Sequence, residues 1–216
     1  MKIALIHALG HSIPPIESAF ASVWPEASLM NLLDDSLSKD REKDAALRPV
    51  MTERFLTLGR YAAGIGVDAI LFTCSAFGPC IEAVARELAP LPVLKPNEAM
   101  IEEATAQGGK IGLLVTFWPT AGSMLREFAA GSDVEPRVAE GALAALDRGD
   151  GDEHDRLVAT EAKKFTQCDL IVLGQFSLAR ARDVVAGSTG LPVLTTPDSA
   201  VKKLKTILTG LDTTQT

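Results

Sequence analysis

Short apolar runs alternate with longer amphipathic segments along most of the chain. Parallel strands joined by crossover helices produce this alternation, because strands that are covered on both faces read as continuous apolar runs. The pattern predicts eight strands, at residues 2–7, 27–32, 69–72, 93–94, 110–115, 134–138, 170–173 and 193–194. We therefore expect an α/β fold.

Three segments between these strands have the periodicity of helices. Residues 40–63 place Leu47, Met51, Phe55, Leu58 and Ala62 at three- and four-residue steps, which predicts one long amphipathic helix. Residues 79–88 begin with proline, as first helical turns often do, and residues 152–165 begin with acidic side chains. On this last helix we expect His154 to face solvent.

The two halves of the chain repeat each other. Residues 2–6 resemble residues 110–114, residues 68–74 resemble residues 169–175, and Leu-Pro-Val-Leu at 91–94 recurs at 191–194. The last two pairs are offset by 101 and 100 residues, so their order and their spacing agree. We predict two pseudo-symmetric lobes, residues 1–97 and 98–197, each a four-stranded parallel sheet flanked by helices. A C-terminal helix at 198–212 is expected to pack back on the first lobe.

Composition and charge narrow the classes of partner. Of the 216 residues, 47% are hydrophobic and 23% are charged, which is ordinary for a globular chain. The net charge of −7 and the lack of a dense Lys/Arg run argue against a nucleic acid partner. No segment approaches the ~18 apolar residues of a membrane span, and no signal-peptide pattern is present. We expect a cytoplasmic protein that does not bind membranes.

Three cysteines carry the most obvious chemistry. Cys74, Cys80 and Cys168 cannot form a closed disulfide set, and their spacing fits no zinc site, so we expect no metal. Cys74 directly follows an apolar strand and precedes a predicted helix. Ligands of parallel sheets bind beyond the carboxyl ends of the strands, and a helix N-terminus there can lower the pKa of a thiol. Cys74 is therefore the candidate acid, base or nucleophile, whereas Cys80 and Cys168 fit small buried hydrophobes.

The repeated lobes, the Thr73-Cys74-Ser75 word and the two Leu-Pro-Val-Leu words make the chain resemble the aspartate/glutamate/hydantoin racemase superfamily. Its members have two α/β lobes that face each other across an active-site cleft. Each lobe contributes one cysteine, and the two cysteines lie on opposite faces of the substrate α-carbon. The resemblance, which covers nearly the whole chain, implies an enzyme of racemase or isomerase type. It also implies a small carboxylate or amino-acid-like substrate and no cofactor.

The residue that pairs with Cys74 in the second lobe is Gln175, where the resemblance predicts a second cysteine. An amide neither takes nor gives a proton at neutral pH, although it donates and accepts hydrogen bonds. Racemisation by two thiols is therefore closed to this chain, and Gln175 is expected to orient the substrate or its oxyanion. Arylmalonate decarboxylase and maleate isomerase, which belong to the same superfamily, use a cysteine as proton donor and as nucleophile, respectively. A one-cysteine decarboxylase or cis–trans isomerase is thus an alternative.

Several residues in the loops after the strands are candidates for substrate binding. They are His11, Ser75, Ala76, Thr116, Thr120, Phe176 and Ser177. The hydroxyl groups match the substrate-carboxylate loops of the superfamily, although Ser75-Ala76 departs from the Asn-Thr of amino-acid racemases. His7 and His11 are further candidates for a missing acid or base, and Trp118 and Phe176 for an apolar wall.

A non-catalytic protein that binds small carboxylates is the alternative of a different class, since fold alone does not decide function. The reactivity of Cys74 separates the two. A thiol pKa well below about 8.5 favours the enzyme, and an inert thiol favours the binding protein. A redox sensor built on Cys74 and Cys80 ranks third. The sequence leaves open whether the protein forms a homo-oligomer.

Overall fold

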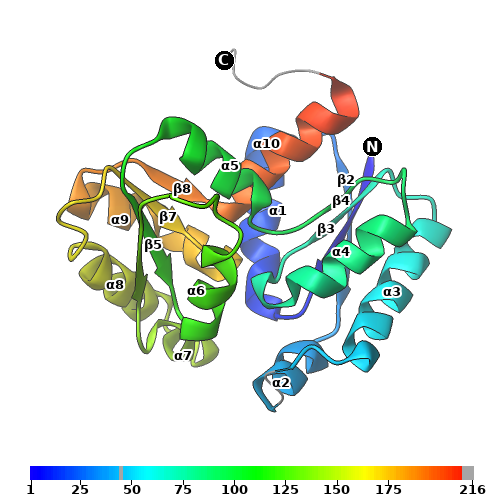
Figure 1. Cartoon of the computed structure of the whole chain (residues 1–216), viewed down its shortest axis with the longest axis horizontal. Helices are drawn as coiled ribbons and strands as arrows, with labels where there is room; N and C mark the ends of the chain where they lie inside the picture. The colour runs from blue at the N-terminus through cyan, green and yellow to red at the C-terminus, as the bar shows by residue number, and fades with distance from the viewer. Residues whose placement is uncertain (44–45, 211–216) are drawn as a thin grey trace. The chain divides into compact units, whose positions relative to one another are not determined.

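The computed structural model describes residues 1–43 and 46–210 of the chain. It divides into two compact units (Figure 1). Unit 1 consists of Met1–Pro96 and the chain from Ala200 onward, and unit 2 consists of Asn97–Ser199. None of the helices within the described ranges is long and apolar enough to cross a membrane.

Unit 1 contains one parallel four-stranded sheet in the order β2-β1-β3-β4. Its strands are β1 (Lys2–His7), β2 (Ser28–Leu33), β3 (Ala69–Phe72) and β4 (Val93–Leu94). Its helices are α1 (Ile13–Val23), α2 (Ser36–Lys43), α3 (Pro49–Gly64) and α4 (Gly78–Glu87), with short 3₁₀ turns η1 (Gly10–Ser12) and η2 (Ser75–Phe77). The last helix, α10 (Thr196–Thr209), crosses the unit boundary, and its Lys205 Nζ donates to the Val23 carbonyl of α1 at 2.9 Å.

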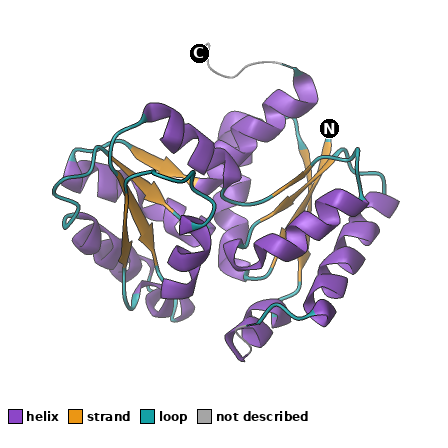
Figure 2. Ribbon diagram, in the orientation of Figure 1, coloured by secondary structure: helices purple, strands orange, loops and turns teal. Residues whose placement is uncertain are grey.

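Unit 2 repeats this arrangement in its own parallel sheet, in the order β6-β5-β7-β8. The strands are β5 (Ile111–Val115), β6 (Val134–Val138), β7 (Leu170–Leu173) and β8 (Val193–Thr195). The helices are α5 (Glu98–Gln107), α6 (Trp118–Leu125), α7 (Ala142–Asp147), α8 (Gly151–Ala162) and α9 (Arg182–Thr189), with the 3₁₀ turn η3 (Phe176–Ala181) before α9. In each unit the strands lie between layers of helices (Figure 2).

The strand register shows that the two units are copies of one design. In unit 1, Ile6 of β1 is opposite Phe72 of β3, and in unit 2, Leu114 of β5 is opposite Leu173 of β7. Each ladder continues by one more bond, from the Thr73 N–H to Ile6 O at 3.0 Å and from the Gly174 N–H to Leu114 O at 2.9 Å. The predicted duplication is therefore confirmed at the level of individual hydrogen bonds.

The opposite ends of the ladders agree as well. The Lys2 N–H donates to Asp68 Oδ2 at 2.7 Å, and the Lys110 N–H donates to Asp169 Oδ2 at 2.7 Å. Each aspartate thus fastens the start of the first strand of its unit to the start of the third. Cys74 and Gln175 then occupy equivalent positions, two residues beyond the last paired residue of the third strand.

Alternate residues of the strands build the cores on the two faces of each sheet. In unit 1, Ala4 and Ile6 of β1 pack with Phe55 of α3 and Ile81 of α4. In unit 2, Leu114 of β5 packs against helices α8 and α9, whereas its neighbours Leu113 and Val115 pack against α5 and α6. Because both faces are covered, the central strands are apolar throughout, which is why their sequences predicted them well.

The predicted helix at 40–63 is wrong as a single element. The structure has α2, which ends at Lys43, and α3, which begins at Pro49; residues 44–45 lie outside the described ranges. Proline disfavours the helical conformation of the residue before it, and Arg48 is accordingly extended. The apolar stripe is nevertheless present, because Phe55 and Ala62 are buried in the unit 1 core. Of the predicted C-terminal helix, residues 211–212 also lie outside the described part of the chain.

Gly112 lies where the backbone of β5 passes close to the ring of Phe165. A Cβ on this residue would be 2.9 Å from the Phe165 ring. We expect Gly112→Val to lower the free energy of unfolding by about 1–3 kcal/mol, the usual cost of overpacking a core. Gly187→Ala in α9 is the matched control, since nothing lies within 4 Å of its Cβ position. Urea unfolding of both variants tests this, and equal stabilities would contradict it.

Candidate functional site

Cys74 stands at the carboxyl end of β3, in the place that the sequence assigns to it. Its extended backbone (φ −124°, ψ 118°) leads into the 3₁₀ turn η2, and α4 begins only at Gly78. The side chain is half-buried, next to the buried Ser75 and the half-buried Ala76. The Ala76 backbone N–H hydrogen-bonds to the Cys74 sulfur.

The pKa of the Cys74 thiol is shifted in the direction opposite to our expectation. Burial raises its pKa to about 11, and the Ala76 N–H offsets only part of this effect. The prediction of a thiol activated by a helix dipole is therefore wrong, because loss of hydration outweighs the backbone donor and η2 separates Cys74 from α4. At neutral pH the free protein therefore carries Cys74 mainly as the protonated thiol.

A chain of hydrogen bonds runs from the residue before Cys74 to the surface of unit 1. His7 Nδ1 lies 2.8 Å from Thr73 Oγ1, and His7 Nε2 lies 2.9 Å from Asn31 Oδ1. Asn31 Nδ2 in turn donates to Glu17 Oε1 at 2.8 Å. This series of hydrogen bonds was not predicted from the sequence, where its signal was the polar Asn31 within a mostly apolar strand.

The hydrogen bonds fix the form of His7, which is fully buried. Burial lowers its pKa, although the bond to Asn31 and the charge of Glu17 oppose this, so the ring is neutral at pH 7. Asn31 uses its amide N–H on Glu17, so its oxygen accepts from the His7 Nε2–H and the Nδ1 accepts from the Thr73 hydroxyl. Both ring nitrogens are occupied. The hypothesis that His7 is the missing acid or base is therefore disfavoured, and His7 is better described as a support for Thr73.

Gln175 occupies the equivalent place in unit 2, directly before η3, and is half-buried. Its Oε1 accepts two hydrogen bonds from Thr116, from the backbone N–H at 2.6 Å and from the hydroxyl at 2.9 Å. Because the atom that faces an N–H must be the oxygen, the orientation of the amide is fixed. Within the described part of the chain the Gln175 Nε2 has no hydrogen-bond partner, so the free end of this side chain is a donor of two hydrogen bonds.

The structure distributes the other predicted binding residues over both units. Thr116 contacts Gln175, as above. His11 lies in η1 and is half-buried. Thr120, Phe176 and Ser177 are 4%, 2% and 3% exposed, so their side chains are packed in the interior, whereas Trp118 is 57% exposed. Their part in substrate binding, and the cleft predicted between the lobes, stay predictions.

The remaining cysteines and His154 are buried side chains. Cys80 is fully buried and its sulfur lies 3.5 Å from Thr52 Oγ1, while Cys168 is 7% exposed. Both fit the role of small hydrophobes that the sequence suggested. The expectation for His154 is wrong, because its side chain is fully buried and its Nδ1 lies 2.7 Å from Asp155 Oδ1. Helical periodicity did not reveal this, since α8 is packed beneath η3 and α9 on that face.

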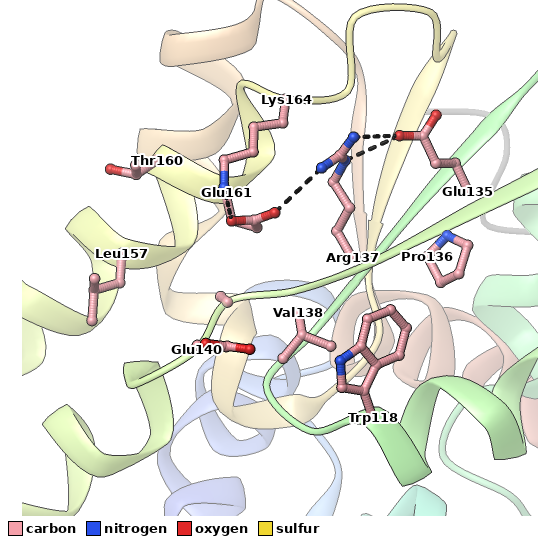
Figure 3. A pocket seen from close by; sticks show the side chains of 11 residues that line it. Trp118, Glu135, Pro136, Arg137, Val138, Glu140, Leu157, Thr160, Glu161 and Lys164 are labelled. Carbon is pink, nitrogen blue, oxygen red and sulfur yellow. Dashed lines mark hydrogen bonds and ion pairs between the residues drawn. The ribbon is translucent and has the colours of Figure 1, made fainter.

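A separate pocket of about 610 Å³ lies along the edge strand β6 of unit 2 (Figure 3). Trp118, Val138 and Leu157 supply apolar walls. Most of its charged groups pair with one another: Arg137 pairs with Glu135 at 2.9 Å and with Glu161 at 3.5 Å, and Lys164 pairs with Glu161 at 2.6 Å. The pocket therefore offers few unpaired groups to a charged ligand. Across residues 1–43 and 46–210, no three His, Cys, Asp or Glu side chains are grouped to hold a metal ion.

Comparisons with known proteins agree with the fold of two parallel four-stranded sheets flanked by helices. Residues 14–204 match the family model described as Asp/Glu/Hydantoin racemase. Among solved structures, the chain is similar to an aspartate racemase of Picrophilus torridus, with a TM-score of 0.74 and 13% identity over 96% of this chain and 94% of that one. An allantoin racemase of Klebsiella pneumoniae gives a TM-score of 0.69 and 19% identity, over 99% and 90%.

A third similar structure is a glycine-to-cysteine variant of arylmalonate decarboxylase in a sulfate-associated form. It gives a TM-score of 0.70 and 17% identity, over 97% of this chain and 94% of that one. At such low identities these likenesses show the fold alone. No curated protein matches the chain in sequence.

The buried, neutral His7 makes the stability of the protein depend on pH. In the unfolded chain His7 takes up a proton below about pH 6.5, whereas in the folded protein its lowered pKa prevents this. The free energy of unfolding should therefore be highest above pH 6.5 and fall as the pH drops below it. We expect this fall to be smaller in His7→Gln, measured by urea unfolding between about pH 7.5 and pH 5.5. Parallel curves for the two proteins would contradict the assignment.

Proposed function

Because the chain belongs to the Asp/Glu/hydantoin racemase family, we propose that it is a cofactor-independent enzyme that acts at the α-carbon of a small carboxylate through one thiol, Cys74. The observation that carries the proposal is the unequal pair at equivalent strand ends. One position holds an ionisable thiol, and the other holds an amide whose oxygen is already bound. A thiol is suited to proton transfer to carbon, and an oriented amide is suited to hydrogen bonding with a carboxylate.

The state of the thiol selects among the reactions that one cysteine can perform. With a pKa of about 11, roughly one Cys74 thiol in ten thousand is ionised at neutral pH. Proton abstraction by Cys74, and nucleophilic attack as in a cis–trans isomerase, both begin from this rare thiolate. Donation of a proton begins from the abundant thiol. We therefore assign Cys74 the role of proton donor to a carbanion.

Decarboxylation supplies such a carbanion without a second base. The bond between the α-carbon and one carboxylate breaks, carbon dioxide leaves, and the electron pair stays on the α-carbon. Cys74 Sγ–H then gives its proton to that carbon, and the thiolate takes a proton back from solvent. The Gln175 amide N–H group, fixed by Thr116, is suited to hold the remaining carboxylate or the enolate oxygen as negative charge develops there.

A carboxylate-binding protein without catalysis is the second candidate, and one observation favours it. The raised thiol pKa of Cys74 is the property expected of an unreactive cysteine. The oriented Gln175 amide would serve binding as well as catalysis. The two candidate functions differ in whether a bound carboxylate loses carbon dioxide or takes up a proton from solvent, or leaves unchanged.

Incubation in deuterated water with substituted malonates, aspartate, glutamate, hydantoins and maleate tests the proposed function. We expect a malonate to lose carbon dioxide and its product to carry one deuterium on a single face of the α-carbon. Cys74→Ser should reduce the rate by about 10²–10⁴-fold, the usual contribution of a positioned acid. Cys168→Ala, a buried thiol that precedes β7, is the control and should keep the activity.

Turnover that survives Cys74→Ser unchanged would overturn the role of the thiol. Binding of these carboxylates by calorimetry, without release of carbon dioxide or label uptake from any of them, would establish the binding protein instead.

A further inference from the structure

We propose that Arg41 of α2 is a positioning residue for the Cys74 thiol. Its guanidinium holds the Ala76 backbone so that the Ala76 N–H stays directed at the sulfur. The inference rests on the proposed function, since it matters for catalysis only if Cys74 transfers a proton. All the residues involved belong to unit 1.

The contact runs through the short loop that follows β3. Arg41 Nε donates to the Ala76 carbonyl oxygen at 3.4 Å, while the N–H of the same residue hydrogen-bonds to Cys74 Sγ. Ala76 is thus held from both sides, by the arginine through its carbonyl and by the thiol through its amide. When Cys74 gives up its proton, a fixed N–H donor and a nearby cation remain to stabilise the thiolate.

The helix that carries Arg41 is itself firmly attached. Leu37 is buried in the core, and Ser38 Oγ donates to the carbonyl of Ala8 at 2.6 Å. Arg54 of α3 pairs with Asp34, which precedes α2, at 2.6 Å and with Asp40, which lies within α2, at 2.8 Å. Arg41 therefore projects from a fixed backbone toward the loop, and its side chain is half-buried there.

The charge of Arg41 acts in the same direction as the hydrogen bond. Burial is the largest effect and raises the thiol pKa of both Cys74 and Cys80, and the Arg41 charge lowers both. Loss of the guanidinium should thus make the Cys74 thiolate still harder to form.

Alkylation of Cys74 by iodoacetamide measures this directly, because only the thiolate reacts. The rate at Cys74 is followed by peptide mass analysis between about pH 8 and pH 9.5, with Cys168 of unit 2 as internal reference. We expect Arg41→Gln to slow Cys74 by roughly 3–10-fold at each pH, which corresponds to a rise of at most about one pKa unit. Arg41→Lys keeps the charge without Nε and should give an intermediate rate.

Lys39→Gln is the matched control, since it removes one positive charge from the same helix. Lys39 is 66% exposed and pairs with Asp35 at 2.7 Å, and its charge is not among the influences on the Cys74 pKa. A wild-type rate in Arg41→Gln, or an equal decrease in Lys39→Gln, would overturn the proposal. If Arg41→Gln fails to unfold cooperatively and is therefore misfolded, the Cys74 alkylation rate of Arg41→Lys is compared with the wild-type and Lys39→Gln rates instead. Absence of turnover on every substrate would contradict the proposed enzyme but not this result, which requires no substrate.

Discussion

The parallel ladder between the first and third strands of each unit determines where Cys74 and Gln175 stand. Its last hydrogen bonds, from Thr73 to Ile6 and from Gly174 to Leu114, extend the third strand by one residue. The next residue in each unit is then free of the sheet and precedes a 3₁₀ turn. One repeated backbone design therefore presents a thiol in unit 1 and an amide in unit 2.

The surroundings of Cys74 combine burial with supports that act through the backbone. His7 and Asn31 hold the Thr73 side chain on one side, and the Ala76 N–H contacts the sulfur on the other. None of these contacts supplies a base close enough to replace a second thiol. Cys74 is thus held in place, and its raised pKa keeps it protonated, as the proposed one-sided proton donation requires.

Most of the fold could be predicted from the sequence because the central strands of both sheets are buried on both faces. Their apolar runs are local signals, and the strands at 69–72 and 170–173 have the predicted bounds. The half-buried edge strand at 134–138 also has its predicted bounds. The break before Pro49 was missed because the apolar stripe continues through it. The burial of His154 and the direction of the Cys74 pKa shift depend on packing between distant segments, which no local pattern records. The equivalence of Cys74 and Gln175, in contrast, followed from the repeat alone.

The titration of Cys74 tests the central claim most directly. The ultraviolet absorbance of the thiolate is recorded against pH for the wild type and for Cys74→Ala, and the difference isolates this one sulfur. The assignment of Cys74 as a resting proton donor predicts that the difference stays small through pH 9 and rises toward a midpoint of about 11. A midpoint at or below about 8.5 would show a thiolate available at neutral pH and would contradict the assignment of Cys74 as a resting acid.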